Sequence, residues 1–239
     1  MNKTILAAVA LAAMPLAANA QNLNGFYIGA RGGLNWMFNS DISVNGVATV
    51  SGFGSGQLNG THSASFNTGW ALGGFAGYDF VGPRVEIEAL YRDNQGSQRG
   101  TLPIAGVGIL RSQGVAEVRQ TSVMANVYYD FFARETFTPY VGAGAGIAFI
   151  DSHFGALTNS SDTEFAYQAI VGVGYKVMPN LRLNLDARYY GTLNPTFSNS
   201  YNPSGFTVPV SGYVSGSYPN NNFALLASVS YSFGPAPAR

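Results

Sequence analysis

The sequence predicts an all-β fold, an eight-stranded antiparallel up-and-down transmembrane β-barrel, and three observations lead to this prediction. Eight segments of about ten to fifteen residues alternate between large apolar side chains and small or polar ones, which is the pattern of strands with one apolar face. Only 10% of the 239 residues are charged, against roughly 25% in an ordinary soluble domain. The connections between the segments alternate between tight and long, which is typical of membrane barrels.

The first twenty residues have the features of an export signal. Lys3 supplies a positive charge, an apolar stretch runs from Ile5 to Leu16, and Ala18-Asn19-Ala20 matches an A-x-A cleavage site. We therefore expect residues 1–20 to be a cleaved signal peptide and residues 21–239 to form one outer-membrane β-barrel domain. No later segment has the roughly eighteen consecutive apolar residues of a spanning helix, so strands are expected to cross the bilayer.

The alternation places the eight strands in order along the chain, at 25–37, 66–80, 83–93, 118–131, 137–150, 165–178, 180–192 and 222–233. Tight turns are predicted at 81–82, 132–136 and 179. The long connections are rich in Gly, Ser, Asn and Thr, and they occupy 38–65, 94–117, 151–164 and 193–221. An even number of strands places both termini at the short-turn end, and the long connections are expected to be extracellular loops.

Four of these strands show the two faces clearly. The apolar face of the first strand has Phe26, Ile28, Ala30, Leu34 and Trp36. That of the third strand has Val85, Ile87, Ala89 and Tyr91. That of the seventh strand has Leu181, Leu183, Leu185, Ala187 and Tyr189. That of the last strand has Phe223, Leu225, Ala227, Val229, Tyr231 and Phe233, and Leu226 is the one large apolar residue on its other face. Apart from Asp93 at the very end of the third strand, every charge in the first, third and seventh strands lies opposite the apolar face, as a barrel in lipid requires.

Aromatic residues distinguish this barrel from its main alternative, a secreted β-sandwich. The outward aromatics of the short-turn end are Phe26, Tyr78, Phe80, Tyr129, Phe131, Phe137, Tyr175, Tyr231 and Phe233. Those of the other end are Trp36, Trp70, Tyr91, Phe149, Tyr167, Tyr189 and Phe223. Two belts match the two interfaces of a bilayer, whereas a sandwich in water has no need of them.

The inner face of the predicted barrel carries a lumenal charge network of six bases and five acids. Its members are Arg31, Asp79, Arg84, Glu86, Glu88, Arg92, Asp130, Lys176, Arg182, Asp186 and Arg188. Eight strands enclose a lumen only just wide enough for side chains, so we expect structural ion pairs. A narrow conducting path is the alternative, because the inner face of the fifth and sixth strands is nearly bare, with Gly142, Gly144, Gly146, Ala148, Gly172 and Gly174.

Catalytic, metal and cofactor sites are not predicted. A Ser-His-Glu arrangement is conceivable in one long connection, which contains Ser152, His153, Ser160, Ser161 and Glu164, but no spacing fixes a nucleophile against a base. The two histidines are far apart, and the chain has no cysteine, so neither a metal site nor thiol chemistry is expected. The clustered Lys and Arg residues of a nucleic-acid-binding protein are absent from the sequence.

Four segments carry a family resemblance: residues 84–92, 123–131, 138–146 and 165–175. The chain resembles the opacity-type surface barrels of Gram-negative bacteria, which are related to the OmpA membrane domain and to small "porin family" proteins of alphaproteobacteria. The resemblance implies an outer-membrane location and a non-enzymatic role in envelope integrity, adhesion or host contact through the long loops. A small low-conductance porin is the alternative.

The resemblance also implies partners. These are outer-membrane lipid and lipopolysaccharide, the assembly machinery that recognises the terminal aromatics Tyr231 and Phe233, and a host or surface ligand of the loops. The chain departs from the family pattern in one respect, because Phe233 is followed by Gly-Pro-Ala-Pro-Ala-Arg at 234–239.

Overall fold

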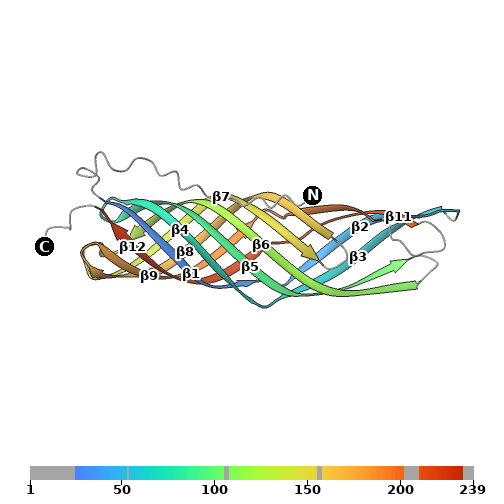
Figure 1. Ribbon diagram of the computed structural model, residues 1–239, viewed down its shortest axis with the longest axis horizontal. Helices are drawn as coiled ribbons and strands as arrows, with labels where there is room; N and C mark the ends of the chain where they lie inside the picture. The colour runs from blue at the N-terminus through green and yellow to red at the C-terminus, as the bar shows by residue number, and fades with distance from the viewer. Residues whose placement is uncertain (1–24, 53, 105–107, 155–157, 202–209, 234–239) are drawn as a thin grey trace.

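The computed structural model describes residues 25–52, 54–104, 108–154, 158–201 and 210–233. Within these ranges the chain forms twelve strands, and eight of them close into an antiparallel ring (Figure 1). The ring strands are β1 (Phe26–Met37), β4 (Thr68–Asp79), β5 (Pro83–Ile104), β6 (Gly108–Asp130), β7 (Phe137–Phe154), β8 (Thr158–Met178), β9 (Leu181–Thr192) and β12 (Asn221–Ser232). The predicted fold class, an eight-stranded antiparallel barrel, is confirmed.

The ring closes because β1 pairs on both sides. Its residues pair with β12 from Tyr27↔Ser232 to Met37↔Asn222, and with β4 from Phe26↔Tyr78 to Trp36↔Thr68. Each remaining ring strand pairs with the next one along the chain. Closure leaves no unpaired edge in this part of the sheet, which lipid requires because it offers backbone groups no hydrogen-bond partners.

Alternate residues of the ring strands are buried in the lumen or exposed on the outside, as the sequence pattern predicts. In β12, the residues from Asn222 to Ser230 alternate strictly between buried and exposed. The outward residues are large and apolar, such as Ile87 at 59% exposure and Leu185 at 48%. Leu226, the exception to the pattern, is fully buried inside.

The short-turn end was predicted closely. The strand ends observed there, including Asp79, Pro83, Asp130 and Phe137, lie within one residue of the predicted bounds. Two of the turns hold a non-glycine residue in the left-handed region, Val81 at φ 65° and Phe132 at φ 57°. Residues other than glycine rarely adopt this backbone conformation. Here the tight turn between two paired strands imposes it.

The prediction of long loops was wrong, because most of each long connection is β-structure. The additional strands are β2 (Ser40–Val50), β3 (Gly54–Phe66), β10 (Thr196–Tyr201) and β11 (Val210–Ser217). β5 and β6 also stay paired far beyond the predicted strands, from Pro83↔Tyr129 to Ile104↔Gly108. A ladder already in register continues at little cost, and the strands need no strictly apolar face once they leave the lipid.

We call this second part of the sheet the extension: β2, β3, β10 and β11, with the distal parts of β5–β8. β3 pairs with β5 from Thr61↔Thr101 to Phe66↔Gly96, and the sheet continues through β2 and β11 to β10. Figure 1 shows β2, β3 and β11 beyond the ring, at the end of the barrel opposite the turn between β8 and β9.

Outward aromatic rings pack against one another at both ends of the ring. At the short-turn end, the ring centroids of Phe26 and Phe233 are 5.8 Å apart. At the other end, those of Trp36 and Phe223 are 5.8 Å apart and those of Trp70 and Tyr91 are 5.4 Å apart. These pairs lie in the two predicted belts.

In the described ranges, no helix is long and apolar enough to span a bilayer. The predicted signal peptide, residues 1–20, and the segment 234–239 lie outside the described residues.

Candidate functional site

The best-defined cluster of functional groups is an ion-pair network inside the ring, centred on Glu88. Arg31 Nη1 and Arg188 Nη1 lie 2.5 and 2.7 Å from the same Glu88 oxygen, Oε2. Arg31 also pairs with Glu86 at 2.6 Å, and Arg188 with Asp186 at 2.5 Å. All five residues are buried. The carboxylates are therefore shared between guanidinium groups, which offsets the cost of burying charge.

A second part of the network lies closer to the short-turn end. Arg84 Nη2 and Arg182 Nη1 bind the two carboxylate oxygens of Asp130, at 2.9 and 2.5 Å. Together with the pairs around Glu88, this makes four arginines and four carboxylates. The formal charges of the paired set sum to zero.

Tyrosines complete the network. Tyr128 donates its hydroxyl to Glu86 at 3.0 Å, and Tyr140 donates to Asp186 at 3.0 Å. The guanidinium carbon of Arg31 lies 3.9 Å from the centroid of the Phe75 ring. These aromatic residues were absent from the predicted set, although their inward parity on β4, β6 and β7 is readable from the sequence.

Three residues of the predicted network lie apart from it. Asp79 accepts a hydrogen bond from the backbone N–H of Val81 at 2.7 Å and caps the turn. Lys176 donates to the carbonyl of Ala133 at 2.6 Å. Arg92 is fully buried but forms no ion pair with any described residue.

The glycine positions of β7 and β8 are covered by neighbouring side chains. A side chain at Gly142 would collide with Tyr128, one at Gly146 with the backbone of Val123 and with Met124, and one at Gly174 with Arg182. The covering residues come from adjacent strands rather than from across the lumen. The small residues therefore give room to the large inward groups beside them.

Above the ion pairs, the interior becomes apolar and then amide-rich. Leu90 and Leu226 are fully buried with Ala71 and Ala224 in one apolar cluster. Beyond it lies a hydrogen-bonded set of buried amides, namely Asn35, Asn94, Gln120, Asn220 and Asn222. The predicted parity places these residues inside, but the sequence pattern did not single them out.

The conceivable Ser-His-Glu arrangement does not assemble at Ser152 and His153. Ser152 is buried and lies 2.5 Å from the hydroxyl of Tyr218, whereas His153 is exposed, on the other face of the same strand. Burial raises the pKa of Tyr218 to about 12, so this phenol stays neutral and cannot act as a base at neutral pH. A hollow of about 260 Å³ nearby is lined by Glu117, Arg119, Asp151, Ser152, His153, Ser160 and Ser161.

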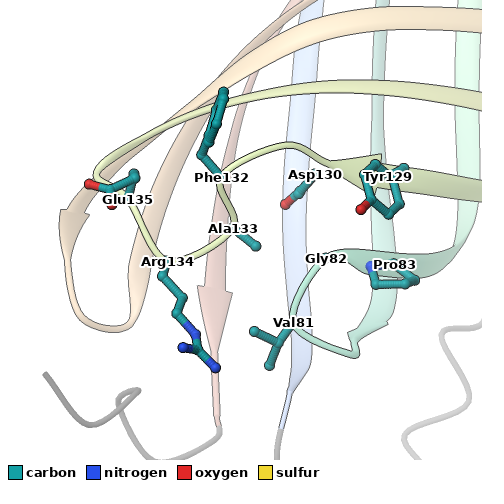
Figure 2. Close-up of a pocket in the computed structure, with 9 residues that line it drawn as sticks. All are labelled: Val81, Gly82, Pro83, Tyr129, Asp130, Phe132, Ala133, Arg134 and Glu135. Atoms are coloured by element: carbon teal, nitrogen blue, oxygen red, sulfur yellow. The ribbon is translucent and has the colours of Figure 1, made fainter.

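A larger pocket, of about 340 Å³, opens at the short-turn end. Figure 2 shows that its lining comes from two adjacent turns, Val81–Pro83 and Phe132–Glu135, with Tyr129 and Asp130 of β6. Asp130 is already bound by Arg84 and Arg182. Among the described residues, no group of His, Asp and Glu could hold a metal ion.

The comparison with known proteins starts from the family model. The model described as "Outer membrane protein beta-barrel domain" matches residues 4–233, almost the whole chain. The chain belongs to this outer-membrane β-barrel family. It is therefore an outer-membrane protein of the Gram-negative type, with its outward apolar residues in a membrane of lipid and lipopolysaccharide.

Two relatives in this family illustrate the similarity. Outer membrane protein PagN of Salmonella typhimurium is 27% identical over 77% of this chain and 81% of its own length. Major surface antigen 4 of Anaplasma marginale is 29% identical over 72% of this chain and 61% of its own length. Both carry the names of outer-membrane or surface proteins.

Among solved structures, the outer membrane protein OprG of Pseudomonas aeruginosa is similar in fold. It aligns with a TM-score of 0.50 and 16% identity, over 89% of this chain and 98% of that chain. At this identity the likeness concerns the fold alone.

Proposed function

We propose that this barrel is a non-enzymatic surface protein, whose extension contacts host or environmental surfaces while the ion-pair network closes the lumen. The observation that carries the proposal is the extension itself. Four strands and the ends of two long hairpins build a continuous sheet beyond the ring, where a barrel serving only to cross the membrane would need short loops. The naming of one relative as a major surface antigen supports the same role.

The orientation follows from the lengths of the connections. The long ones face the outside of the cell in outer-membrane barrels, and the short ones face the periplasm. We infer that the extension is extracellular and that the pocket at the short-turn end is periplasmic.

The test is removal of β2 and β3. Trp36 and Thr68 are directly paired at the end of the β1–β4 ladder, so a short Gly-Asn turn can replace residues 40–66 without breaking the ring. The variant should still fold, as seen by its heat-modifiable migration in gel electrophoresis. Cells displaying it should bind less to host-cell or matrix-coated surfaces than cells displaying the parent.

Arg134→Ala, at the opposite end of the barrel, is the control and should leave adhesion unchanged. A folded deletion variant that adheres as well as the parent would contradict a role for β2 and β3. An effect of Arg134→Ala equal to that of the deletion would show that adhesion depends on barrel integrity alone.

The alternative function, a small low-conductance porin, has less support. The bare inner face of β7 and β8 would be its route, but Tyr128, Met124 and Arg182 cover that face. The balanced charges of the network also give no reason for selectivity toward one sign of ion.

We also propose that residues 1–20 are removed on export and that Tyr231 and Phe233 are presented to the assembly machinery. Both aromatics are exposed on the outward face at the short-turn end, with ring centroids 5.2 Å apart. Phe233→Ala should lower the yield of assembled barrel in cells while leaving refolding in detergent intact. Equal yields in cells would contradict this role.

A further inference from the structure

Arg92 is the buried arginine of the barrel interior that has no ion pair among the described residues. The four other buried or half-buried arginines of the lumen each bind at least one carboxylate. Arg92 is 0% exposed and has no carboxylate within ion-pair distance among the described residues. A buried guanidinium without a direct ion-pair partner is unfavourable, so an anion bound to it from outside the chain would stabilise it.

Two nitrogen donors of the Arg92 guanidinium have no hydrogen-bond acceptor among the described residues. Its Nη1 donates to Ser122 Oγ at 2.8 Å, and its carbon lies 3.8 Å from the centroid of the Tyr190 ring. Its Nε and Nη2 are buried and have no hydrogen-bond acceptor among the described residues. A cation–π contact supplies partial negative charge to one face of the guanidinium, but it does not accept the hydrogen bonds of these two groups.

A second buried N–H donor without a hydrogen-bond acceptor among the described residues lies directly beside Arg92. Gln120 is its cross-strand partner on the inner face, and Gln120 is 1% exposed. Residues paired in this way have their Cβ atoms about 5 Å apart. Asn220 donates to Gln120 Oε1 at 3.1 Å, while Gln120 Nε2 has no acceptor among the described residues.

The amides behind Gln120 strengthen its donor. Asn222 donates to the side-chain oxygen of Asn220 at 2.9 Å, and Asn220 donates in turn to Gln120. Hydrogen bonds that run in one direction polarise one another, so the free Nε2 hydrogens become more positive. The chain therefore directs partial positive charge toward the charged Arg92.

We propose that Arg92 and Gln120 bind a small monovalent anion, such as chloride, inside the lumen. The site consists of N–H donors and one full positive charge, and no carboxylate of the described residues lies within ion-pair distance of Arg92. A water molecule would accept the hydrogen bonds but would bring no negative charge into direct contact with Arg92. The anion would complete the neutralisation that the chain's own carboxylates achieve for the other lumenal arginines.

The experiment is a chloride titration of the full chain folded in a non-ionic detergent, with sodium gluconate keeping the ionic strength constant. Binding is read from the excess line width of the chloride-35 nuclear magnetic resonance signal. The wild type should show a saturable excess, and bromide-soaked crystals should show an anomalous peak within hydrogen-bond distance of Arg92. Arg92→Met should reduce the excess at least tenfold.

Two further variants sharpen the test. Gln120→Glu places a carboxylate of the chain opposite Arg92, so it should fold and yet lose the chloride signal. Arg119→Met removes the same charge outside the lumen, where the side chain is 52% exposed, and should keep the signal. A wild type without a saturable signal would overturn the proposal, as would a signal that persists in folded Arg92→Met or Gln120→Glu.

Discussion

Glu88 shows what a single buried carboxylate does in this lumen. Its oxygen Oε2 lies within 2.7 Å of both Arg31 and Arg188, and its Oε1 accepts from Gln168 at 3.3 Å. The side chain is 0% exposed. Removing it would break one buried ion pair of each guanidinium group and leave Arg31 with Glu86 and Arg188 with Asp186.

We expect Glu88→Ala to lower the free energy of unfolding by about 3–5 kcal/mol, the usual cost of breaking a buried ion pair. Reversible unfolding in urea after refolding into lipid vesicles measures the change. A double-mutant cycle with Arg31→Ala then isolates the pair, because the two side chains are in direct contact. A coupling energy near zero would show that Arg31 depends chiefly on Glu86.

Strand β9 tests whether the two faces of the ring are assigned correctly. Leu185 points outward at 48% exposure, while its neighbour Asn184 points inward and donates to Ser228 Oγ at 3.1 Å. Leu185→Arg should cost roughly 2–4 kcal/mol, since it places a charge in lipid near the middle of the membrane. Asn184→Arg should cost less, because the lumen already holds charged groups. Equal losses for the two variants in a refolding assay would reject this register.

The turns at the two ends of the barrel test its orientation. The natural chain has no cysteine, so a single introduced one can be labelled without background. Ser51, in the exposed turn between β2 and β3, should react as Ser51→Cys with a membrane-impermeant maleimide on intact cells. Arg134→Cys, in the β6–β7 turn, should react only after the outer membrane is opened. The reverse pattern would invert the topology.

At the scale of the whole molecule, the interior is filled in layers. Ion pairs lie nearest the short-turn end, then the apolar cluster with Leu90 and Leu226, then the buried amides. A continuous water path would have to pass all three layers. We therefore expect the barrel to behave as a plugged cylinder rather than an open pore.

Purified protein in planar bilayers should show no channel or a small conductance, without strong preference for cations or anions. Glu88→Ala should raise the conductance if the ion pairs form the tightest constriction. A large, stable and strongly selective pore from the wild type would contradict the plugged lumen and favour the porin alternative.

The strands of the ring were predictable from the sequence because each strand by itself carries the alternating pattern that its two environments require. Lipid on one side of each strand and a polar lumen on the other force successive residues such as Leu185 and Asp186 to opposite faces. The same rule identified every charged member of the ion-pair network, since inward parity needs no knowledge of the neighbouring strands.

Only the tertiary structure decided which lumenal side chains pair with one another and which distant strands form one sheet. Which carboxylate serves Arg31, and that Arg92 has none, depends on the register of all eight ladders around the closed ring. The extension was not predicted because strands outside the lipid no longer need an apolar outward face. Without the strict alternation, their sequence resembles that of a loop. Their β-structure comes from pairing such as Thr61↔Thr101, which joins segments far apart in the chain.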